Sequence, residues 1–229
     1  MKSDASLTLP EFIENLVIKN PNEVISSFLD EINVFTLKEL NSRAGLLAKG
    51  LLYNGVSKNT TVALVLAGTT NCLTFVLALA KIGAVLVPVN KNIGLEQFEK
   101  LLVEQNIHTV GFYADEFLSQ FKKIIPGYTQ NERGYLTNEK FLHLKNIVTF
   151  GSVKNRGIFT TRELMLLGDH IDDIEMETII GDISPDDTFV NHIVFEKDSN
   201  IIVQPVSHRD LVEQNKTFHD LQNYLLNLI

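Results

Sequence analysis

Ser207, His208 and Asp210 are the side-chain types of a nucleophile, a base and an orienting acid, and they stand within four residues of the chain. The same spacing fits the start of a helix, with Ser207 as the N-cap and Asp210 at the capping-box position. The cap explains both side chains without catalysis. We therefore expect His208, at the first helical position, to be a surface residue or one retained with its surrounding motif. We predict no catalytic residue here.

Three other places carry side chains that bind metals in proteins. His192 lies in an apolar strand-like run with no second ligand at suitable spacing, so we expect a histidine satisfied within a sheet. The run His170–Asp173 has ligand types for a cation, but it lies in an acidic segment typical of a solvated connector. Cys72 is the only cysteine and lies in an apolar stretch, as buried structural thiols do. We predict no metal site.

The composition excludes several classes of protein. Of 229 residues, 45% are hydrophobic and 21% are charged, which excludes disorder and rod-like assemblies. The net charge of −8 and the pI near 5.2 argue against binding to DNA or other nucleic acid. One cysteine excludes an internal disulfide framework, and no apolar run suits a membrane span or a secretory signal. We expect a cytoplasmic protein.

The first half of the chain alternates between strand-like and helix-like patterns. Apolar residues recur at spacings of three and four from Phe35 to Asn54, after a capping-box pattern of Thr36 and Glu39. Short apolar runs, typical of strands buried on both faces, alternate with further helical patterns. The expected strands are 61–66, 84–89 and 107–113, and the expected helices are 71–82 and 94–105. This order predicts an α/β fold, a doubly wound and mostly parallel sheet flanked by helices.

The second half predicts a different ending. We expect a strand at 144–150, a short helix at 161–167 and an acidic connector at 168–185. Two apolar runs, 188–195 and 201–206, flank the polar residues 196–200 and predict a β-hairpin. Ser207 then begins a final helix with an apolar face. The predicted fold therefore closes with a C-terminal β-hairpin and helix.

Two motifs resemble the adenylate-forming (AMP-binding) enzymes, which include acyl-CoA synthetases, peptide-synthetase adenylation domains and luciferases. Phe35–Asn41, FTLKELN, resembles the opening helix of that family, "(F/L)TYxELN". Leu79–Asn90, LAKIGAVLVPVN, is similar to its second signature, "LKAGAxxVPLxP/D". The similarity runs from about Leu9 to the C-terminus. It implies that residues 1–229 form a single truncated domain equivalent to the first part of the large domain of these enzymes.

The family's phosphate loop, "YTSGTTGxPKG", falls on the predicted hairpin. Ser184–Asp187 matches the lead-in "xPDD", and Ser207–Leu211 matches the following "THxNL". The positions between them are Val194, Phe195, Glu196, Lys197, Asp198, Ser199, Asn200, Ile201, Ile202 and Val203. They contain no glycine, two carboxylates and an isoleucine where the loop lysine belongs. A cradle of backbone N–H groups around ATP needs the glycines, so the resemblance implies a degenerate loop and no bound cofactor.

These observations lead to three hypotheses. The first is a degenerate, non-catalytic relative of AMP-dependent ligases that serves as an interaction or regulatory module. The alternative is the N-terminal fragment of an acyl-CoA synthetase-like ligase that activates a carboxylate with ATP and Mg²⁺, its remaining parts lying outside this chain. A third is a small-molecule or acyl-chain binding protein. We also expect a homo-oligomer or a protein partner, bound through the apolar face Phe218, Leu221, Leu225 and Leu228, because the family's covering half is absent here.

Overall fold

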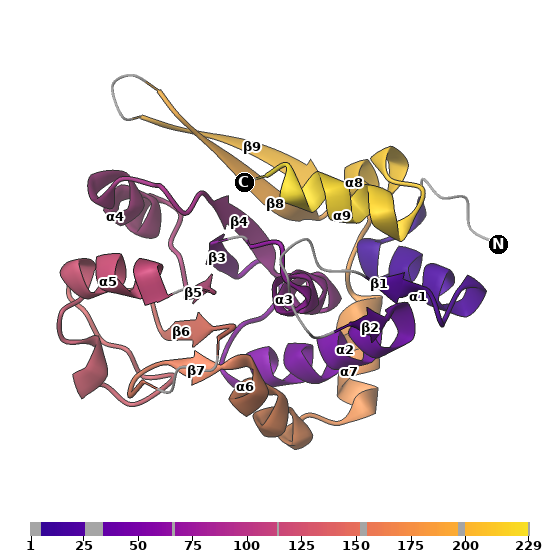
Figure 1. Ribbon diagram of the computed structural model, residues 1–229, viewed down its shortest axis with the longest axis horizontal. Coiled ribbons are helices and arrows are strands. Elements are labelled where there is room, and N and C mark those ends of the chain that lie inside the picture. The colour runs from indigo at the N-terminus through magenta and orange to yellow at the C-terminus, as the bar shows by residue number, and fades with distance from the viewer. Residues whose placement is uncertain are drawn as a thin grey trace.

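A computed structural model describes residues 6–25, 34–65, 67–113, 115–151, 155–196 and 200–228 (Figure 1). A seven-stranded sheet with the order β7-β6-β5-β3-β4-β8-β9 forms the centre, and a two-stranded sheet pairs β1 with β2. The strands are β1 Val24–Ile25, β2 Phe35–Thr36, β3 Thr61–Val65, β4 Val85–Val89, β5 Thr109–Phe112, β6 Asn146–Thr149, β7 Phe159–Thr160, β8 Thr188–Phe195 and β9 Ile201–Ser207. The α-helices are α1 Leu9–Lys19, α2 Leu37–Tyr53, α3 Thr70–Lys81, α4 Leu95–Glu104, α5 Asp115–Ile124, α6 Thr161–Leu167, α7 Asp173–Gly181, α8 His208–Gln214 and α9 Phe218–Leu226.

The sheet is parallel except for its last pair. β3 pairs with β4 on one side and with β5 on the other, and β6, β7 and β8 extend the parallel arrangement. Only β9, which pairs with β8, is antiparallel within this sheet of the described chain. Burial of β3 to β6 on both faces explains their nearly continuous apolar sequences. The predicted doubly wound, mostly parallel α/β fold is confirmed.

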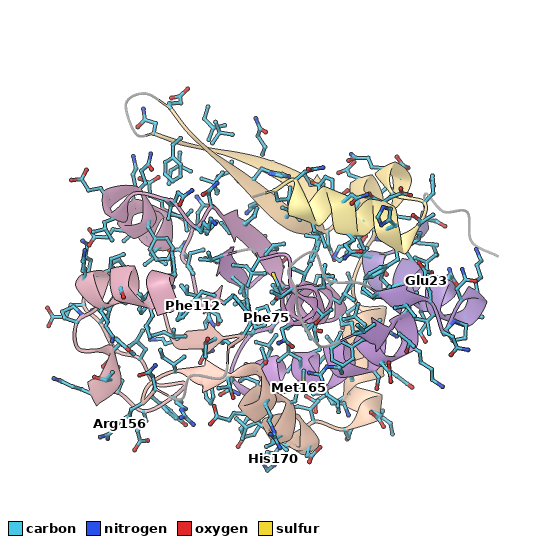
Figure 2. All side chains as sticks on the ribbon, in the orientation of Figure 1. Glu23, Phe75, Phe112, Arg156, Met165 and His170 are labelled. Atoms are coloured by element: carbon cyan, nitrogen blue, oxygen red, sulfur yellow. The ribbon has the colours of Figure 1, made fainter. Side chains whose placement is uncertain are left out.

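Apolar side chains fill a layer on each face of the sheet. One layer includes Phe75 of α3 and takes in α1, α2, α8 and α9, and the other includes Phe112 of β5 and takes in α4 and α5 (Figure 2). Phe75 packs on Phe150 with ring centroids 5.0 Å apart. Phe112 packs on Phe117 at 5.6 Å. The central strands carry apolar side chains on both faces of the sheet, so each face needs its own layer of helices to shield it from water.

Local capping explains where the predicted helix of 35–54 begins. The Thr36 hydroxyl accepts a hydrogen bond from the Glu39 N–H at 3.2 Å, and the Glu39 carboxylate accepts one from the Thr36 N–H at 2.8 Å. This reciprocal pair confirms the predicted capping box, and α2 starts at Leu37. Within the described residues, no helix has both the length and the apolar character that spanning a membrane requires.

Two predictions about the last third of the chain were wrong. The expected connector of 168–185 contains α7, whose N-cap Asp172 accepts a hydrogen bond from the Glu175 N–H at 2.7 Å. The expected single final helix is two helices. The Asn215 side chain donates to the Leu211 carbonyl at 2.7 Å at the end of α8, and Thr217 begins α9 with its own capping box. Helices α1 and α5 were not predicted at all.

Candidate functional site

Of the positions compared with the phosphate loop, the described ones, 194–196 and 200–203, lie in the outer part of a β-hairpin that projects from the body of the molecule (Figure 1). Val194 lies opposite Ile202, and Phe195 lies opposite Ile201. The ladder continues outward, since the Glu196 N–H donates a hydrogen bond to the Asn200 carbonyl at 2.9 Å. Lys197, Asp198 and Ser199 lie outside the described residues. The predicted hairpin is confirmed, with β8 bounded as expected.

The two faces of this hairpin have different surroundings. Ile193, Phe195 and Ile201 pack against the apolar layer that contains α4. Val194 and Ile202, on the opposite face, are 43% and 42% exposed. Alternation of side chains along a strand produces this division. The described part of the hairpin therefore has one face packed against the protein and one face partly open to solvent.

His192 is held by a partner from the last helix. Its Nε2 lies 2.9 Å from the hydroxyl of Tyr224 on α9, and burial lowers the pKa of the imidazole. The two rings meet edge to face with centroids 6.2 Å apart. The expectation of a histidine satisfied next to the sheet is confirmed. This contact also fastens α9 to the hairpin.

Of the two alternatives for His208, the one that makes it a surface residue was wrong. His208 is 0% exposed, and its Nδ1 accepts a hydrogen bond from the Leu9 N–H at 3.3 Å. Burial lowers its pKa to about 4, although the nearby Asp187 carboxylate acts in the opposite direction. Its Nε2 has no hydrogen-bond partner among the described residues. The imidazole is buried because α1 packs against α8.

The side chains of Ser207 and Asp210 form a helix cap in which the His208 side chain takes no part. The Ser207 hydroxyl donates to the Asp210 carboxylate at 2.6 Å and accepts from the Asp210 N–H at 3.1 Å. The Asp210 carboxylate also accepts from the Ser207 N–H at 2.9 Å. Each side chain thus accepts a hydrogen bond from the backbone N–H of the other residue, which confirms the predicted capping box. A triad would require the histidine to lie between them.

The other candidate metal ligands have structural partners. Asp172 caps α7, and Asp173 forms an ion pair with Lys49 at 2.7 Å. The His170 ring stacks on Tyr53 with centroids 4.7 Å apart. Cys72 is 2% exposed inside α3, as expected for a structural thiol. Each of these side chains therefore has a role in packing or capping.

The predicted interaction face lies inside the chain's own core. Phe218, Leu221 and Leu225 are 2%, 0% and 3% exposed, and Leu228 is partly buried against the same layer. The prediction of an exposed face was wrong because α9 folds back beside β8 and covers its own apolar side (Figure 1). These residues therefore stabilise the fold, and Leu228 is the one of the four that is only partly buried.

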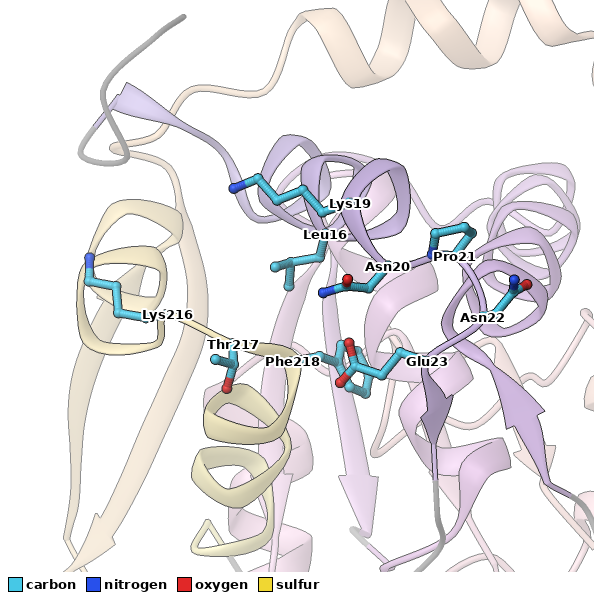
Figure 3. A pocket seen from close by; sticks show the side chains of 9 residues that line it. All are labelled: Leu16, Lys19, Asn20, Pro21, Asn22, Glu23, Lys216, Thr217 and Phe218. Carbon is cyan, nitrogen blue, oxygen red and sulfur yellow. The ribbon is translucent and has the colours of Figure 1, made fainter.

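A groove between the end of α1 and the start of α9 was not anticipated (Figure 3). Its volume is about 780 Å³, with Leu16 and Phe218 among the apolar residues that line it. Lys19 comes from α1 and Lys216 from the segment before α9, and the Glu23 carboxylate also lines the groove. Two ammonium groups and one carboxylate therefore line the groove beside its apolar residues.

The groove was missed because α1 was missed. The signal was present in the sequence, where Thr8 and Glu11 have capping-box spacing and Pro10 stands between them. In the structure the Glu11 N–H donates to the Thr8 hydroxyl at 3.4 Å, and the Thr8 N–H donates to the Glu11 carboxylate at 2.9 Å. A search for this pattern would have found the helix. It would not have found the groove, which needs α9 as its second wall.

Comparisons with solved structures agree with the fold. The anthranilate CoA ligase AuaEII in complex with anthranoyl-AMP aligns with a TM-score of 0.73 and 15% identity, covering 90% of this chain and 36% of the ligase. The luciferase-like enzyme of the mealworm Zophobas morio aligns with a TM-score of 0.71 and 16% identity, covering 99% of this chain and 54% of that enzyme. A long-chain-fatty-acid-CoA ligase from Archaeoglobus fulgidus aligns with a TM-score of 0.68 and 16% identity, covering 91% and 38%. At these identities the likeness concerns the fold.

Sequence comparison identifies the family. Bacitracin synthase 2 of Bacillus licheniformis is 29% identical over 94 residues, which are 41% of this chain and 4% of the synthase. The chain therefore spans a small part of that relative and about a third to a half of the solved structures. The AMP-binding enzyme family matches residues 14–134, just over half of the chain, from α1 to the loop after α5. With the fold and both motifs in agreement, this chain belongs to the AMP-binding enzyme family.

Proposed function

We propose that this chain is a degenerate, non-catalytic member of the family, which acts by binding as an interaction or regulatory module and does not adenylate a carboxylate. The observation that carries the proposal is the hydrogen bond from the Glu196 N–H to the Asn200 carbonyl. A phosphate-binding loop directs backbone N–H groups toward the ligand. Here a backbone N–H of the segment that matches the loop is bonded to the other side of the hairpin, so it is not directed toward a ligand.

The chemistry of the segment supports the same conclusion. Residues 194–203 contain no glycine, and a residue with a Cβ pays ~1–2 kcal/mol at each left-handed position that a cradle requires. Glu196 and Asp198 bring negative charge to the place where ATP phosphates would lie. Like charges about 4 Å apart repel by about 4 kcal/mol at an effective dielectric constant of 20. The residues present do not fit the nucleotide.

Calorimetric titration with Mg·ATP tests the proposal directly. We expect no heat of binding and no thermal shift with either ATP or AMP. A ligand present at 100 times its dissociation constant would add about 2.7 kcal/mol to the free energy of unfolding, a readily measured shift. A CoA ligase that is active in the same buffer serves as the positive control. Saturable micromolar binding of Mg·ATP would overturn the proposal.

The structural likeness to CoA ligases supports one alternative, an N-terminal fragment of an acyl-CoA synthetase-like ligase. In that case ATP and Mg²⁺ would be the cofactors, and the remaining catalytic parts would come from outside residues 1–229. The alternative predicts nucleotide binding once those parts are supplied. Release of pyrophosphate in the presence of a carboxylic acid would establish it.

A further inference from the structure

A second cavity lies at the carboxyl end of β4, between the β4–α4 loop, α4 and the inner side of the hairpin. Its volume is about 430 Å³. Asn90 and Asn92 of the loop and Gln97 of α4 contribute amide groups, and Leu101, Ile193 and Phe195 contribute apolar surface. Elements far apart in the sequence therefore meet around one space, and Figure 1 shows α4 beside the projecting hairpin. The volume lies within the range of small-molecule sites, roughly 300–1,000 Å³.

The chain topology places α4 and the β4–α4 loop on this side of the sheet. β4 and β5 lie on opposite sides of β3, so the chain reverses direction across the sheet after β4. Helix α3, which follows β3, packs in one apolar layer, and α4, which follows β4, packs in the other. The loops after β3 and β4 consequently diverge to opposite faces. The cavity lies on the α4 side of this divergence, where the β4–α4 loop faces β8, the strand beside β4, and none of the described residues in the loop after β3 lines it.

The side chains around the cavity favour an uncharged ligand. Among the described residues that line it, none carries a formal charge, although 21% of the chain is charged. The Asn92 N–H donates to the Asn90 side-chain oxygen at 2.9 Å, which fixes the loop in a tight turn. The amide of half-buried Gln97 offers both a donor and an acceptor. Asn90 and Asn92 are exposed at the mouth of the cavity, whereas Val89 and Leu101 are buried. An ionised group in the inner part would therefore lose its hydration without gaining an opposite charge.

We propose that this cavity binds an uncharged amphipathic small molecule, with a hydrocarbon or aromatic body and one amide, ester or alcohol group. The body contacts Leu101, Ile193 and Phe195, and the polar group meets the amide of Gln97. This inference goes beyond the proposed function, which concerns nucleotide at the hairpin tip, because the cavity lies on the α4 side of the hairpin. Of the ten positions 194–203, Phe195 is the one that lines it among the described residues. Nucleotide titration therefore does not test it.

The test uses N-phenyl-1-naphthylamine, an uncharged fluorophore whose emission rises in apolar surroundings. We expect saturable binding to the full chain with one site, displaced by octanamide at concentrations at least ten times lower than those of octanoate. Octanamide and octanoate share the same chain length and differ in charge. Equal displacement by the two would overturn the assignment of an uncharged ligand, and absence of saturable binding would overturn the site.

Two variants on the same helix locate the binding. Gln97→Trp places a large side chain in the cavity, and we expect at least a tenfold loss of fluorophore affinity. Val103→Trp is the matched control, since Val103 is 45% exposed on α4 and does not line this cavity. Thermal unfolding of both variants checks that they fold. Equal affinities of the two folded variants would place the fluorophore elsewhere and overturn the proposal.

Discussion

The Leu9 N–H donates a hydrogen bond to Nδ1 of His208 across 3.3 Å, although the two residues are 199 positions apart. The contact joins the first turn of α1 to the first turn of α8. Because Nδ1 accepts this bond, the imidazole is neutral and carries its proton on Nε2. Protonation of Nδ1 would break the contact inside the core, so the junction between the two ends of the chain depends on pH.

The first prediction concerns acid stability. Burial lowers the pKa of His208 to about 4, against about 6.5 in an unfolded chain. Between these values the unfolded chain binds a proton that the folded chain does not, so stability falls as the pH falls. Above about pH 6.5 the neutral His208 contributes about 3 kcal/mol to the free energy of unfolding. This contribution is lost as the pH falls toward 4. Asp187 and Lys58 are the charged groups that act on the imidazole, in opposite directions.

Urea unfolding at pH 7 and pH 4 measures this effect when wild type is compared with His208→Gln, which has no ionisable group. We expect the wild type to lose about 3 kcal/mol more than the variant. His108 and His192, whose pKa values burial also lowers, remain in both proteins and cancel in the comparison. Parallel loss in the two proteins would mean that His208 does not control acid unfolding.

A second prediction contrasts two glycines of α2. A Cβ on Gly50 would collide with the backbone carbonyl of Leu164 on α6, whereas a Cβ on Gly45 meets no atom within 4 Å. Alanine is favoured over glycine inside a helix by about 1 kcal/mol. We therefore expect Gly45→Ala to raise the free energy of unfolding by up to about 1 kcal/mol.

Gly50→Ala should instead lower the free energy of unfolding by about 1–3 kcal/mol, because α2 and α6 must move apart. Chemical denaturation of both variants is the measurement. The same sign of effect in both would show that α2 and α6 do not pack at Gly50 as described.

The third prediction concerns the contact between His192 and Tyr224. Tyr224→Phe removes the hydroxyl that lies 2.9 Å from Nε2 and should cost about 1 kcal/mol. A double-mutant cycle with His192→Leu isolates the pair, and we expect a coupling energy of about 0.5–1.5 kcal/mol. Additive effects of the two substitutions would indicate that the hydrogen bond does not fasten α9 to the hairpin.

The fourth prediction follows from the burial of the α9 face. Phe218 is 2% exposed, so Phe218→Ala should cost about 3–5 kcal/mol of folding free energy. Leu166→Ala is a suitable control, because Leu166 is 65% exposed and should change stability by less than about 0.5 kcal/mol. A Phe218→Ala protein of unchanged stability with an altered sedimentation mass would contradict the buried position.

Much of the fold could be predicted because its elements have local signals. β8 has the predicted bounds of Thr188–Phe195, since a mostly apolar run between turn residues is typical of a strand. The capping boxes at Thr36 and Ser207 were also predicted, because each involves residues only three positions apart. The absence of glycine between Val194 and Val203 is likewise a property of the residues themselves.

Helix α7 was missed for a physical reason. Its apolar residues do not gather on one side, since Ile174 is 76% exposed while Met176 is buried. A helix of this kind lacks the periodic stripe that identifies an amphipathic helix. Its start depends on the cap at Asp172, which the sequence presents as one acidic residue among several.

The sequence alone determined the alternation of strands and helices, the family motifs and the absence of glycine from residues 194–203, because each depends on residues close together in the chain. Only the tertiary structure decided which apolar faces are covered. Leu221 and Leu225 form an apolar stripe in the sequence, and the folding of α9 beside β8 makes that stripe part of the core. His208 is buried for the same kind of reason, since burial is a property of what packs against a residue, and its partner Leu9 comes from the opposite end of the chain.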